Sequence, residues 1–486
     1  MAKQVDVLIV GAGLSGIGMA CHLKEKRPGT SFEILEARGS IGGTWDLFRY
    51  PGIRSDSDMH TLGFAFKPWT AKKSIADAPS IMAYLHETVA EHGIADAISF
   101  QRHVDSASWS SDAQRWRVEV TGPDGPETYD AGVLAVCAGY YSYDHGYQPE
   151  FPGREDFQGE VIHPQAWPED LDYAGKRVTV IGSGATAVTI VPKVAATAAK
   201  VTMLQRRPTY MVAGPDHDWI ANLLRKLLPD ALAYRITRAK NTAFQQYVYR
   251  RSRKNPEKLR RDLLKRVTKE LPAGYDVDRH FTPSYNPWDE RLCLVTNGDL
   301  FEGIRNGKVE MVTDTIERFD AGGIVTTGGT HIDADIIVTA TGLEMVALGE
   351  IAFDVDGRRV NFADTWTYKG YAYSGVPNLI SVFGYVNASW TLRADLISEN
   401  LCRILDALDE RGAASFTPTL KAGEEAMPRR HWLEQFQPGY VQRAAALLPA
   451  QGDHAPWLNP QDYRADRKMF LEDPVDDGWM AFAGAR

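Results

Sequence analysis

The chain has 486 residues, a hydrophobic fraction of 44% and a net charge of −9 at pH 7. These values are typical of a globular protein with two or three domains. The acidic balance argues against nucleic-acid binding, which needs a concentrated basic face. No apolar run reaches about eighteen residues, so we expect no transmembrane segment.

The N-terminus leads directly into the apolar segment Val5–Val10, without the charged, apolar and small-residue order of a secretory signal. The cysteines Cys21, Cys137, Cys293 and Cys402 are widely spaced and form no CxxC pair. Reduced thiols in the cytoplasm are the simplest interpretation, and no His/Cys cluster has the spacing of a metal site.

A first nucleotide-binding unit opens the chain. Residues 5–10 predict a buried strand, a helix follows to about residue 22, and residues 31–36 predict the next strand. The turn between the first strand and the helix reads GxGxxG, with glycines Gly11, Gly13 and Gly16. Such a turn lets the backbone approach a pyrophosphate, and the helix N-terminus offers free N–H groups to it. Glu36 stands twenty residues beyond Gly16, where a carboxylate can accept hydrogen bonds from ribose hydroxyls.

The same pattern returns about 170 residues later. Residues 176–181 and 201–205 predict strands, and residues 188–195 predict the start of the helix between them. The turn of this second unit consists of Gly182, Ser183, Gly184, Ala185, Thr186 and Ala187. A second dinucleotide site is therefore predicted.

Two arginines distinguish the second unit from the first. Arg206 and Arg207 follow its second strand, and no carboxylate occupies that place. Guanidinium groups match phosphate geometry, so this unit suits a nucleotide with a 2′-phosphate. We expect FAD at the first unit and NADPH at the second. A nicotinamide can reduce a flavin, which then needs an acceptor; without a CxxC pair or a metal cluster, O2 or an external acceptor remains.

The fold class expected from this organisation is α/β, with two Rossmann-like dinucleotide-binding domains and a helical insertion. Residues 1–145 would form the first part of the FAD-binding domain, and residues 146–330 the NADP-binding domain. Residues 331–486 would complete the FAD-binding domain and form a C-terminal cover, with a strand at 332–338. Leu, Arg and Lys recur at helical spacing within the insertion, at about 215–275. Its basic face is most simply a solvated surface, and contact with a membrane surface is the alternative.

Longer motifs carry a family resemblance. Residues 157–168 read FQGEVIHPQAWP, which resembles the Baeyer–Villiger fingerprint FxGxxxHxxxW followed by Pro or Asp; flavin-containing monooxygenases end this pattern in Phe or Tyr. The matching positions are Phe157, Gly159, His163, Trp167 and Pro168. Residues 42–56 match a second family motif, [A/G]GxWxxxx[F/Y]P[G/M]xxxD, at every defined position. The segments PWDERLC at 287–293 and NASWT at 387–391 resemble the ethionamide-activating type of these class B flavoprotein monooxygenases.

The resemblance implies an enzyme that uses FAD, NADPH and O2. It would convert ketones to esters or lactones through a C4a-peroxyflavin, and thioethers to sulfoxides. Arg291 corresponds to the active-site arginine of the family, and Asp56 to the aspartate that positions it. A cation there would stabilise the negative charge that develops during oxygen transfer.

Further residues are carried over from the family with smaller roles. Thr44, Trp45 and Asp46 would line the flavin site, with Asp46 near the ring system, and Val104 would touch adenine through its backbone. His163 and Trp167 lie on the connection between domains, where a hinge or packing role is expected. Trp390 and Tyr385 would either wall the substrate pocket or belong to the core.

One position departs from the family pattern. Relatives commonly place a lysine before the active-site arginine, where it helps bind the 2′-phosphate, but this chain has Glu290. A carboxylate there would repel phosphate, so the NADPH preference rests mainly on Arg206 and Arg207.

Two other functions remain open on the sequence alone. One is N- or S-oxygenation by a flavin-containing monooxygenase, and the other is a non-catalytic carrier that keeps a flavin-type fold. The sequence does not indicate which ketone or sulfide would be the substrate, nor the oligomeric state.

Overall fold

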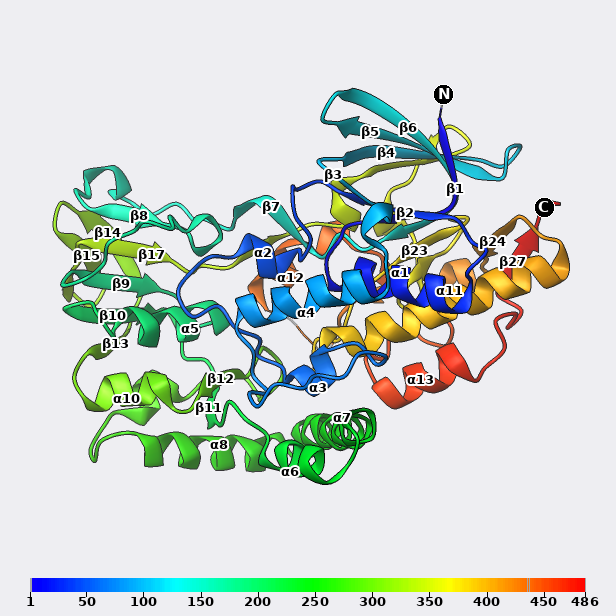
Figure 1. Ribbon diagram of the computed structural model, residues 1–486. Helices are drawn as coiled ribbons and strands as arrows, with labels where there is room; N and C mark the ends of the chain where they lie inside the picture. The colour runs from blue at the N-terminus through cyan, green and yellow to red at the C-terminus, as the bar shows by residue number, and fades with distance from the viewer. Residues whose placement is uncertain (1, 435, 437, 486) are drawn as a thin grey trace.

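The computed structural model describes residues 2–434, 436 and 438–485. Figure 1 shows two lobes, each built on its own sheet, with both chain termini on the larger lobe. Segments from the beginning, middle and end of the chain contribute to the larger lobe, because the chain leaves it once and returns.

The larger lobe is built on a nine-stranded sheet in the order β20-β19-β4-β5-β6-β1-β2-β3, with β23 also paired to β6. Its strands are β1 (Lys3–Val10), β2 (Phe32–Glu36), β3 (Ile98–Phe100), β4 (His103–Ser110), β5 (Arg115–Gly122), β6 (Gly125–Val136), β19 (Ala352–Val355), β20 (Arg358–Arg359) and β23 (Leu379–Ser381). The strands β2, β1, β6 and β23 run parallel. They are covered on both faces, which explains their nearly continuous apolar sequences.

Three helices pack together against this sheet: α1 (Leu14–Lys26), α4 (Ala78–Glu91) and α11 (Trp390–Arg411). Figure 1 shows them side by side below the parallel strands. Their buried apolar residues form one core with those of β1, β2 and β6. Helix α1, which was expected to end near residue 22, extends one turn further, to Lys26.

The smaller lobe contains a parallel five-stranded sheet in the order β13-β10-β9-β17-β8. Its strands are β8 (Glu160–Ile162), β9 (Arg177–Ile181), β10 (Lys200–Gln205), β13 (Val309–Thr313) and β17 (Ile336–Thr339). The helices α5 (Ala185–Val194) and α10 (Asp299–Arg305) pack on it. A three-stranded antiparallel sheet of β14 (Ile316–Asp320), β15 (Gly323–Thr326) and β16 (His331–Asp333) lies beside it.

The chain returns to the larger lobe later than the sequence suggests. The strand expected at 332–338 is divided into β16 and β17, and β17 pairs with β9 and β8 of the second sheet. The strand pairing thus joins the segment up to about residue 342 to the sheet of the smaller lobe, whereas the boundary was expected at residue 331. We propose a division into residues 1–145, 146–342 and 343–486, in which strand pairing sets the second boundary.

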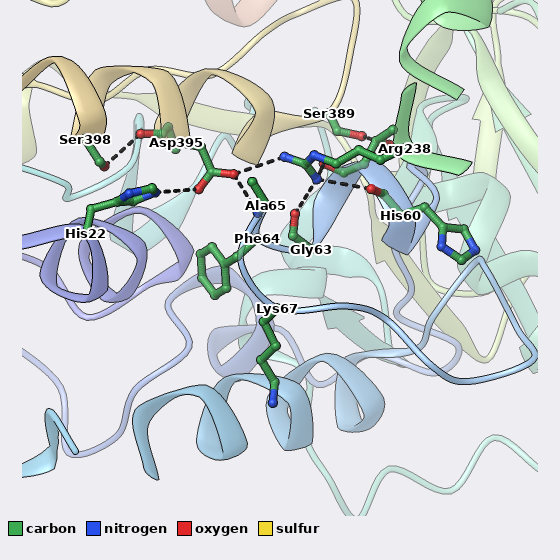
Figure 2. Close-up of polar contacts among 12 residues, drawn as sticks. His22, His60, Gly63, Phe64, Ala65, Lys67, Arg238, Ser389, Asp395 and Ser398 are labelled. Carbon is green, nitrogen blue, oxygen red and sulfur yellow. Dashed lines mark hydrogen bonds and ion pairs between the residues drawn. The ribbon is translucent and has the colours of Figure 1, made fainter. Parts of the chain in front are cut away.

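The helical insertion contains α6 (Trp219–Leu227), α7 (Asp230–Lys254) and α8 (Pro256–Glu270). Figure 1 shows these helices along the lower edge of the molecule. Arg238 of α7 fastens the insertion to the larger lobe: it donates to the carbonyl oxygen of Gly63 at 2.6 Å and to Oδ2 of Asp395 in α11 at 3.0 Å (Figure 2). The other oxygen of Asp395 lies 3.3 Å from Nε2 of His22 in α1.

Smaller elements connect and cover the two lobes. The short helices are α2 (Thr44–Leu47), α3 (Met59–Leu62), α9 (Val277–Phe281), α12 (Gly439–Arg443) and α13 (Tyr463–Leu471). The remaining strands form pairs: β7 (Tyr141–Gly146) with β18 (Leu343–Met345), β11 (Met211–Gly214) with β12 (Cys293–Thr296), β21 (Thr367–Tyr368) with β22 (Ala372–Tyr373), β24 (Ser415–Pro418) with β27 (Met480–Ala483), and β25 (Arg430–His431) with β26 (Ala450–Gln451). Across the described residues, every helix is too short or too polar to cross a membrane, and no group of His, Cys, Asp or Glu has the arrangement of a metal site.

Candidate active site

A cavity of about 1320 Å³ is lined by both glycine turns and by residues from both lobes. The turns after β1 and β9 supply parts of its wall, and so do the connection 138–152 and the C-terminal helix α12. Carboxyl ends of parallel strands therefore meet at this cavity, which is where α/β folds bind nucleotides.

The first turn depends on glycine for two physical reasons. Gly11 has φ +102°, and a Cβ there would lie 2.8 Å from the carbonyl oxygen of Cys137. A Cβ on Gly16 would lie 1.9 Å from the carbonyl oxygen of Gly11, so Gly16 permits the close approach of α1 to the turn. Gly11 and Gly13 line the cavity, whereas Gly16 lies behind it. The N-terminus of α1 has no side-chain cap, which leaves its N–H groups available to an anion.

Replacing Gly16 with alanine is expected to destabilise the first lobe by about 2 kcal/mol, because the new methyl group must displace backbone. It should also reduce retention of the flavin, since the turn would move. Gly29→Ala is the matched control, because a Cβ there meets no atom within 4 Å. Urea unfolding and the ratio of flavin to protein absorbance would measure both effects. Unchanged unfolding and full flavin content in the Gly16 variant would contradict the packing role.

Glu36 stands at the end of β2, buried and at the cavity wall. Its Oε2 accepts from the backbone N–H of Ala12 at 2.8 Å and its Oε1 from that of Arg38 at 2.9 Å. Both bonds hold the carboxylate beside the glycine turn, where a ribose would lie. Val104 is also buried and lines the same end of the cavity.

The second turn has the same construction as the first. Gly182 has φ +133°, and a Cβ on it would lie 2.3 Å from the carbonyl oxygen of Ala340. No side chain caps α5, and a Cβ on Gly184 would meet no atom within 4 Å. The residues of this turn that line the cavity are Gly182, Ser183, Gly184, Ala185 and Thr186. Ala187 does not line it and lies in the core of the smaller lobe.

Arg206 and Arg207 both line the cavity beside the second turn. Nη2 of Arg207 lies 2.5 Å from Oε1 of Glu290, and its guanidinium stands 5.3 Å from the centre of the Tyr285 ring. Glu290 is therefore not isolated at this end of the cavity: it is paired with one of the two arginines expected to recognise the 2′-phosphate. Arg206 has no ion pair with any described residue.

Arg291 is exposed, and the space it faces is the cavity. Removal from bulk water works against its charged form, but the Tyr440 and Tyr140 hydroxyls and Asp56 together raise the pKa of the guanidinium above its ordinary value. Asp56 also lines the cavity. Burial raises the pKa of its carboxyl, and Arg291 and Arg54 oppose that rise. Asp56 and Arg291 thus attract each other at the cavity wall, although no direct ion pair joins their described side chains.

A second arginine faces the cavity that sequence reasoning did not single out. Arg54 pairs through Nη1 with Oδ2 of Asp299 at 3.1 Å. Its Nη2 is buried and has no hydrogen-bond partner among the described residues. The residue lies within the 42–56 motif but at an undefined position, so the motif gave no signal for it.

The C-terminal segment supplies residues that the sequence also failed to indicate. Pro438, Gly439, Tyr440 and Arg443 of the α12 region line the cavity. Arg443 lies over the Tyr147 ring at 3.5 Å, which ties α12 to the connection between the lobes. A cover was expected here, but its sequence has no periodicity that would place individual side chains.

The residues expected around the flavin are divided between wall and support. Thr44 and Trp45 line the cavity, and Oγ1 of Thr44 lies 2.5 Å from the Tyr141 hydroxyl. Asp46 is not part of the wall. Its carboxylate is held between Arg38 and Arg49, each at 2.8 Å, so Asp46 lies one layer behind the cavity.

The fingerprint residues lie outside the cavity and hold the connection between the lobes. Nδ1 of His163 accepts from the backbone N–H of Gln165 at 3.2 Å, and Nε2 lies 3.3 Å from the carbonyl oxygen of Gly342. Burial lowers the pKa of His163, so the imidazole is neutral and both nitrogens are used. Trp167 and Phe157 are buried in the cores of the smaller lobe. A Cβ on Gly159 would lie 2.3 Å from a backbone oxygen, whereas Pro168 is exposed.

Other candidates are placed as follows. Tyr385 and Trp390 line the cavity although both also pack in the protein interior: the Tyr385 hydroxyl donates to Asp466 at 2.8 Å, and Nε1 of Trp390 donates to Ser15 at 2.8 Å. All four cysteines are buried and free. Burial raises the pKa of Cys293 to about 12, so this thiol at the cavity wall is not a nucleophile.

The donor set fits two dinucleotides. Each glycine turn leads into a helix of at least ten residues, and the uncapped N-terminus of that helix faces the cavity. Such an N-terminus suits a pyrophosphate. One turn has a carboxylate at the ribose position and the other has two arginines, which suits a nucleotide without and one with a 2′-phosphate.

Comparison with known proteins supports this assignment. Residues 74–348 match the family described as flavin-binding monooxygenase-like, and residues 9–73 match the NAD(P)-binding Rossmann-like domain. The chain is 50% identical to the FAD-containing monooxygenase EthA of Mycobacterium tuberculosis over 484 residues, covering 99% of this chain and 98% of that protein. It is 46% identical to the probable FAD-binding monooxygenase AlmA of Acinetobacter baylyi, with 99% and 97% covered.

Solved structures agree on the fold. An oxidized steroid monooxygenase bound to NADP superposes with a TM-score of 0.80 at 23% identity, covering 99% of this chain and 100% of that one. An open form of cyclohexanone monooxygenase gives a TM-score of 0.79 at 22% identity, with the same coverage. The predicted α/β fold with two dinucleotide-binding lobes is confirmed. The sequence matches show that the chain belongs to the flavin-binding monooxygenase-like family, and that it is an FAD-dependent monooxygenase.

Proposed function

We propose that the chain is an NADPH- and O2-dependent Baeyer–Villiger monooxygenase that converts ketones to esters or lactones and also oxidises sulfides. One observation carries this proposal: the guanidinium of Arg291 faces the cavity that both dinucleotide turns line. In the overall reaction a ketone, O2, NADPH and a proton give an ester, NADP+ and water. One oxygen atom enters the bond beside the carbonyl carbon, and the other leaves as water.

We assign FAD to the turn after β1 and NADPH to the turn after β9. The carboxylate of Glu36 suits a ribose with free hydroxyls, whereas Arg206 and Arg207 suit a 2′-phosphate. The names of the FAD-containing relatives and of the neighbour bound to NADP support the pair of cofactors.

The flavin, when bound, supplies electron transfer from NADPH and the activation of O2. The side chains around it supply a charged and enclosed setting. Arg291 stabilises negative charge that develops near the ketone oxygen, and Asp56 is a positioning residue that attracts the guanidinium. Tyr140, Trp390 and Tyr440 form an aromatic wall, with Tyr140 stacked on Trp390 at 5.5 Å and its ring centre 6.4 Å from that of Tyr440. Such a wall excludes water from the reacting atoms.

A structural neighbour and the cysteines support the proposed substrate class and location. A neighbour in fold is named for cyclohexanone, which is a cyclic ketone. The four buried, free cysteines fit the cytoplasmic location that we propose.

The test is aerobic NADPH oxidation by the purified protein with linear, cyclic and aryl ketones and with thioethers, followed by product analysis. We expect esters or lactones from ketones and sulfoxides from thioethers. Heteroatom oxides without any ester would favour a flavin-containing monooxygenase of the N- or S-oxygenating kind. Bound flavin without substrate-dependent NADPH oxidation would favour a non-catalytic protein.

A further inference from the structure

Helix α6 turns an apolar face toward solvent. Trp219 and Leu227 are 68% and 70% exposed, and Leu223 between them is 46% exposed. These three residues are spaced by four, so they share one face of the helix. A surface helix of a soluble protein normally buries its apolar face against the core. In the described part of the chain, no segment covers the apolar face of α6. Because α6 is amphipathic and its apolar side faces outward, we interpret this side as an interaction surface.

Helix α7, which adjoins α6, also exposes large apolar side chains. Leu232, Ile236, Phe244 and Tyr247 are 42%, 42%, 65% and 57% exposed. The first three are spaced by multiples of four, and Tyr247 follows Phe244 by three, so they form a stripe on one side of the helix. Together with the three residues of α6, they account for seven of the eight large apolar side chains that are exposed in the described residues. The exposed apolar surface of the protein is therefore concentrated on one pair of adjoining helices.

This orientation of α7 is fixed from its other side. Arg238 is held by the carbonyl oxygen of Gly63 and by Asp395, as Figure 2 shows. Tyr234, one turn earlier, is buried and donates to the carbonyl oxygen of Phe64 at 2.9 Å. The helix cannot rotate its apolar stripe inward without breaking these bonds and exposing Tyr234, so the stripe is a permanent feature of the surface.

The helical segment that carries the stripe is basic. Residues 219–270 contain fifteen Lys and Arg against four Asp and Glu, although the whole chain has a net charge of −9. Lys226 lies on the exposed face of α6, Arg235 precedes Ile236, and Lys254 follows Tyr247 by two turns; all three are exposed. No ion pair joins these three side chains to any other described residue. Two copies of the chain meeting through this face would bring basic groups together, so charge favours an anionic partner.

We propose that α6 and α7 dock the protein on an anionic lipid bilayer. Trp219, Leu223 and Leu227 enter the boundary between headgroups and acyl chains, the α7 stripe lies beside them, and the basic side chains contact lipid phosphates. An interfacial helix of this kind combines apolar insertion with attraction to anionic lipid. The contact is peripheral and requires no membrane-spanning helix. It concerns a surface separate from the cavity, and stands whether or not ketones are the substrates.

Co-sedimentation of the flavin-loaded protein with lipid vesicles tests the proposal. We expect binding to vesicles of about three parts phosphatidylcholine to one part phosphatidylglycerol, and at least about tenfold weaker binding to phosphatidylcholine alone. Raising the salt concentration should weaken binding to the anionic vesicles, because the basic side chains are exposed and screened.

Two sets of variants separate the apolar from the charged contribution. The double variant Trp219→Gln/Leu227→Gln is expected to bind anionic vesicles at least about tenfold more weakly. Leu447→Gln is its control, since Leu447 is 52% exposed but lies outside these helices. The triple variant Lys226→Gln/Arg235→Gln/Lys254→Gln should lose the preference for phosphatidylglycerol. Arg117→Gln/Arg359→Gln, on strands β5 and β20, removes exposed charge elsewhere and should leave binding unchanged. NADPH oxidation in solution should be the same in all these proteins.

Three results would overturn the proposal. The first is a wild-type protein that does not sediment with anionic vesicles, and the second is equal binding by the apolar variant and the wild type. The third is a soluble dimer, seen by sedimentation velocity, that becomes monomeric in the Trp219→Gln/Leu227→Gln protein and does not bind vesicles. That result would assign this face to a second copy of the chain.

Discussion

Arg291→Ala is expected to retain flavin and to lose ester formation by about 10²- to 10³-fold in kcat, the range observed when one group that stabilises developing negative charge is removed. The side chain faces the cavity, and its pKa is raised by Tyr440, Tyr140 and Asp56 despite its removal from bulk water. An arginine side chain is positively charged at neutral pH, so the substitution removes a full positive charge from the cavity wall. Ester yield by gas chromatography and flavin absorbance would be measured on the same preparation.

Two further variants define what Arg291 contributes. Arg291→Lys keeps a charge but loses the planar group, so we expect an intermediate rate. Arg359→Ala removes an arginine that is 61% exposed on β20 and should react as the wild type does. If Arg291→Ala formed ester at the normal rate, the guanidinium would have no part in oxygen transfer. Loss of flavin from the same variant would instead indicate a structural role at the cavity wall.

The sequence predicted the parts of the site that local chemistry determines. Both glycine turns, with Gly11 and Gly182 at positive φ, lie where the GxGxxG spacing placed them. Glu36 and Arg206 also lie at the cavity, because Glu36 is the last residue of β2 and Arg206 directly follows β10, and the carboxyl ends of parallel strands meet at one edge of the sheet. For the same reason α/β architecture could be inferred from short apolar strands that alternate with helices.

What the sequence could not predict depends on contacts between distant segments. Tyr440 reaches the cavity from an irregular C-terminal segment, and Arg54 occupies an undefined motif position. Asp46 was expected near the flavin ring; its ion pairs with Arg38 and Arg49, which hold its side chain one layer behind the cavity wall, have no signal in the motif. The return of the chain to the larger lobe after β17 also has no local signal, since the sequence of this strand does not indicate with which of the two sheets it pairs. Such features arise from packing of the whole chain, which no window of residues contains.

Glu290→Lys is expected to increase the preference for NADP+ over NAD+ by about a hundredfold. Nη2 of Arg207 lies 2.5 Å from Oε1 of Glu290, so the carboxylate occupies a guanidinium that we assign to phosphate binding and would repel an incoming 2′-phosphate. The substitution changes the charge facing that phosphate by two units. Partly exposed charge pairs are worth about 0.5–1 kcal/mol each, and the phosphate carries nearly two negative charges at neutral pH. A difference of about 2–3 kcal/mol corresponds to roughly a hundredfold in affinity.

Glu290→Gln separates the two causes, because it releases Arg207 without adding a positive charge. We expect it to strengthen NADP+ binding by about tenfold and to leave NAD+ binding unchanged, since NAD+ has no 2′-phosphate. Calorimetric titration of the flavin-loaded protein with each nucleotide measures these affinities independently of turnover. Weaker NADP+ binding by Glu290→Gln would contradict this account. It would mean that the carboxylate holds Arg207 over the Tyr285 ring, in an orientation that binds phosphate. The Glu290–Arg207 pair would then favour coenzyme binding, although the negative charge of Glu290 alone would oppose it.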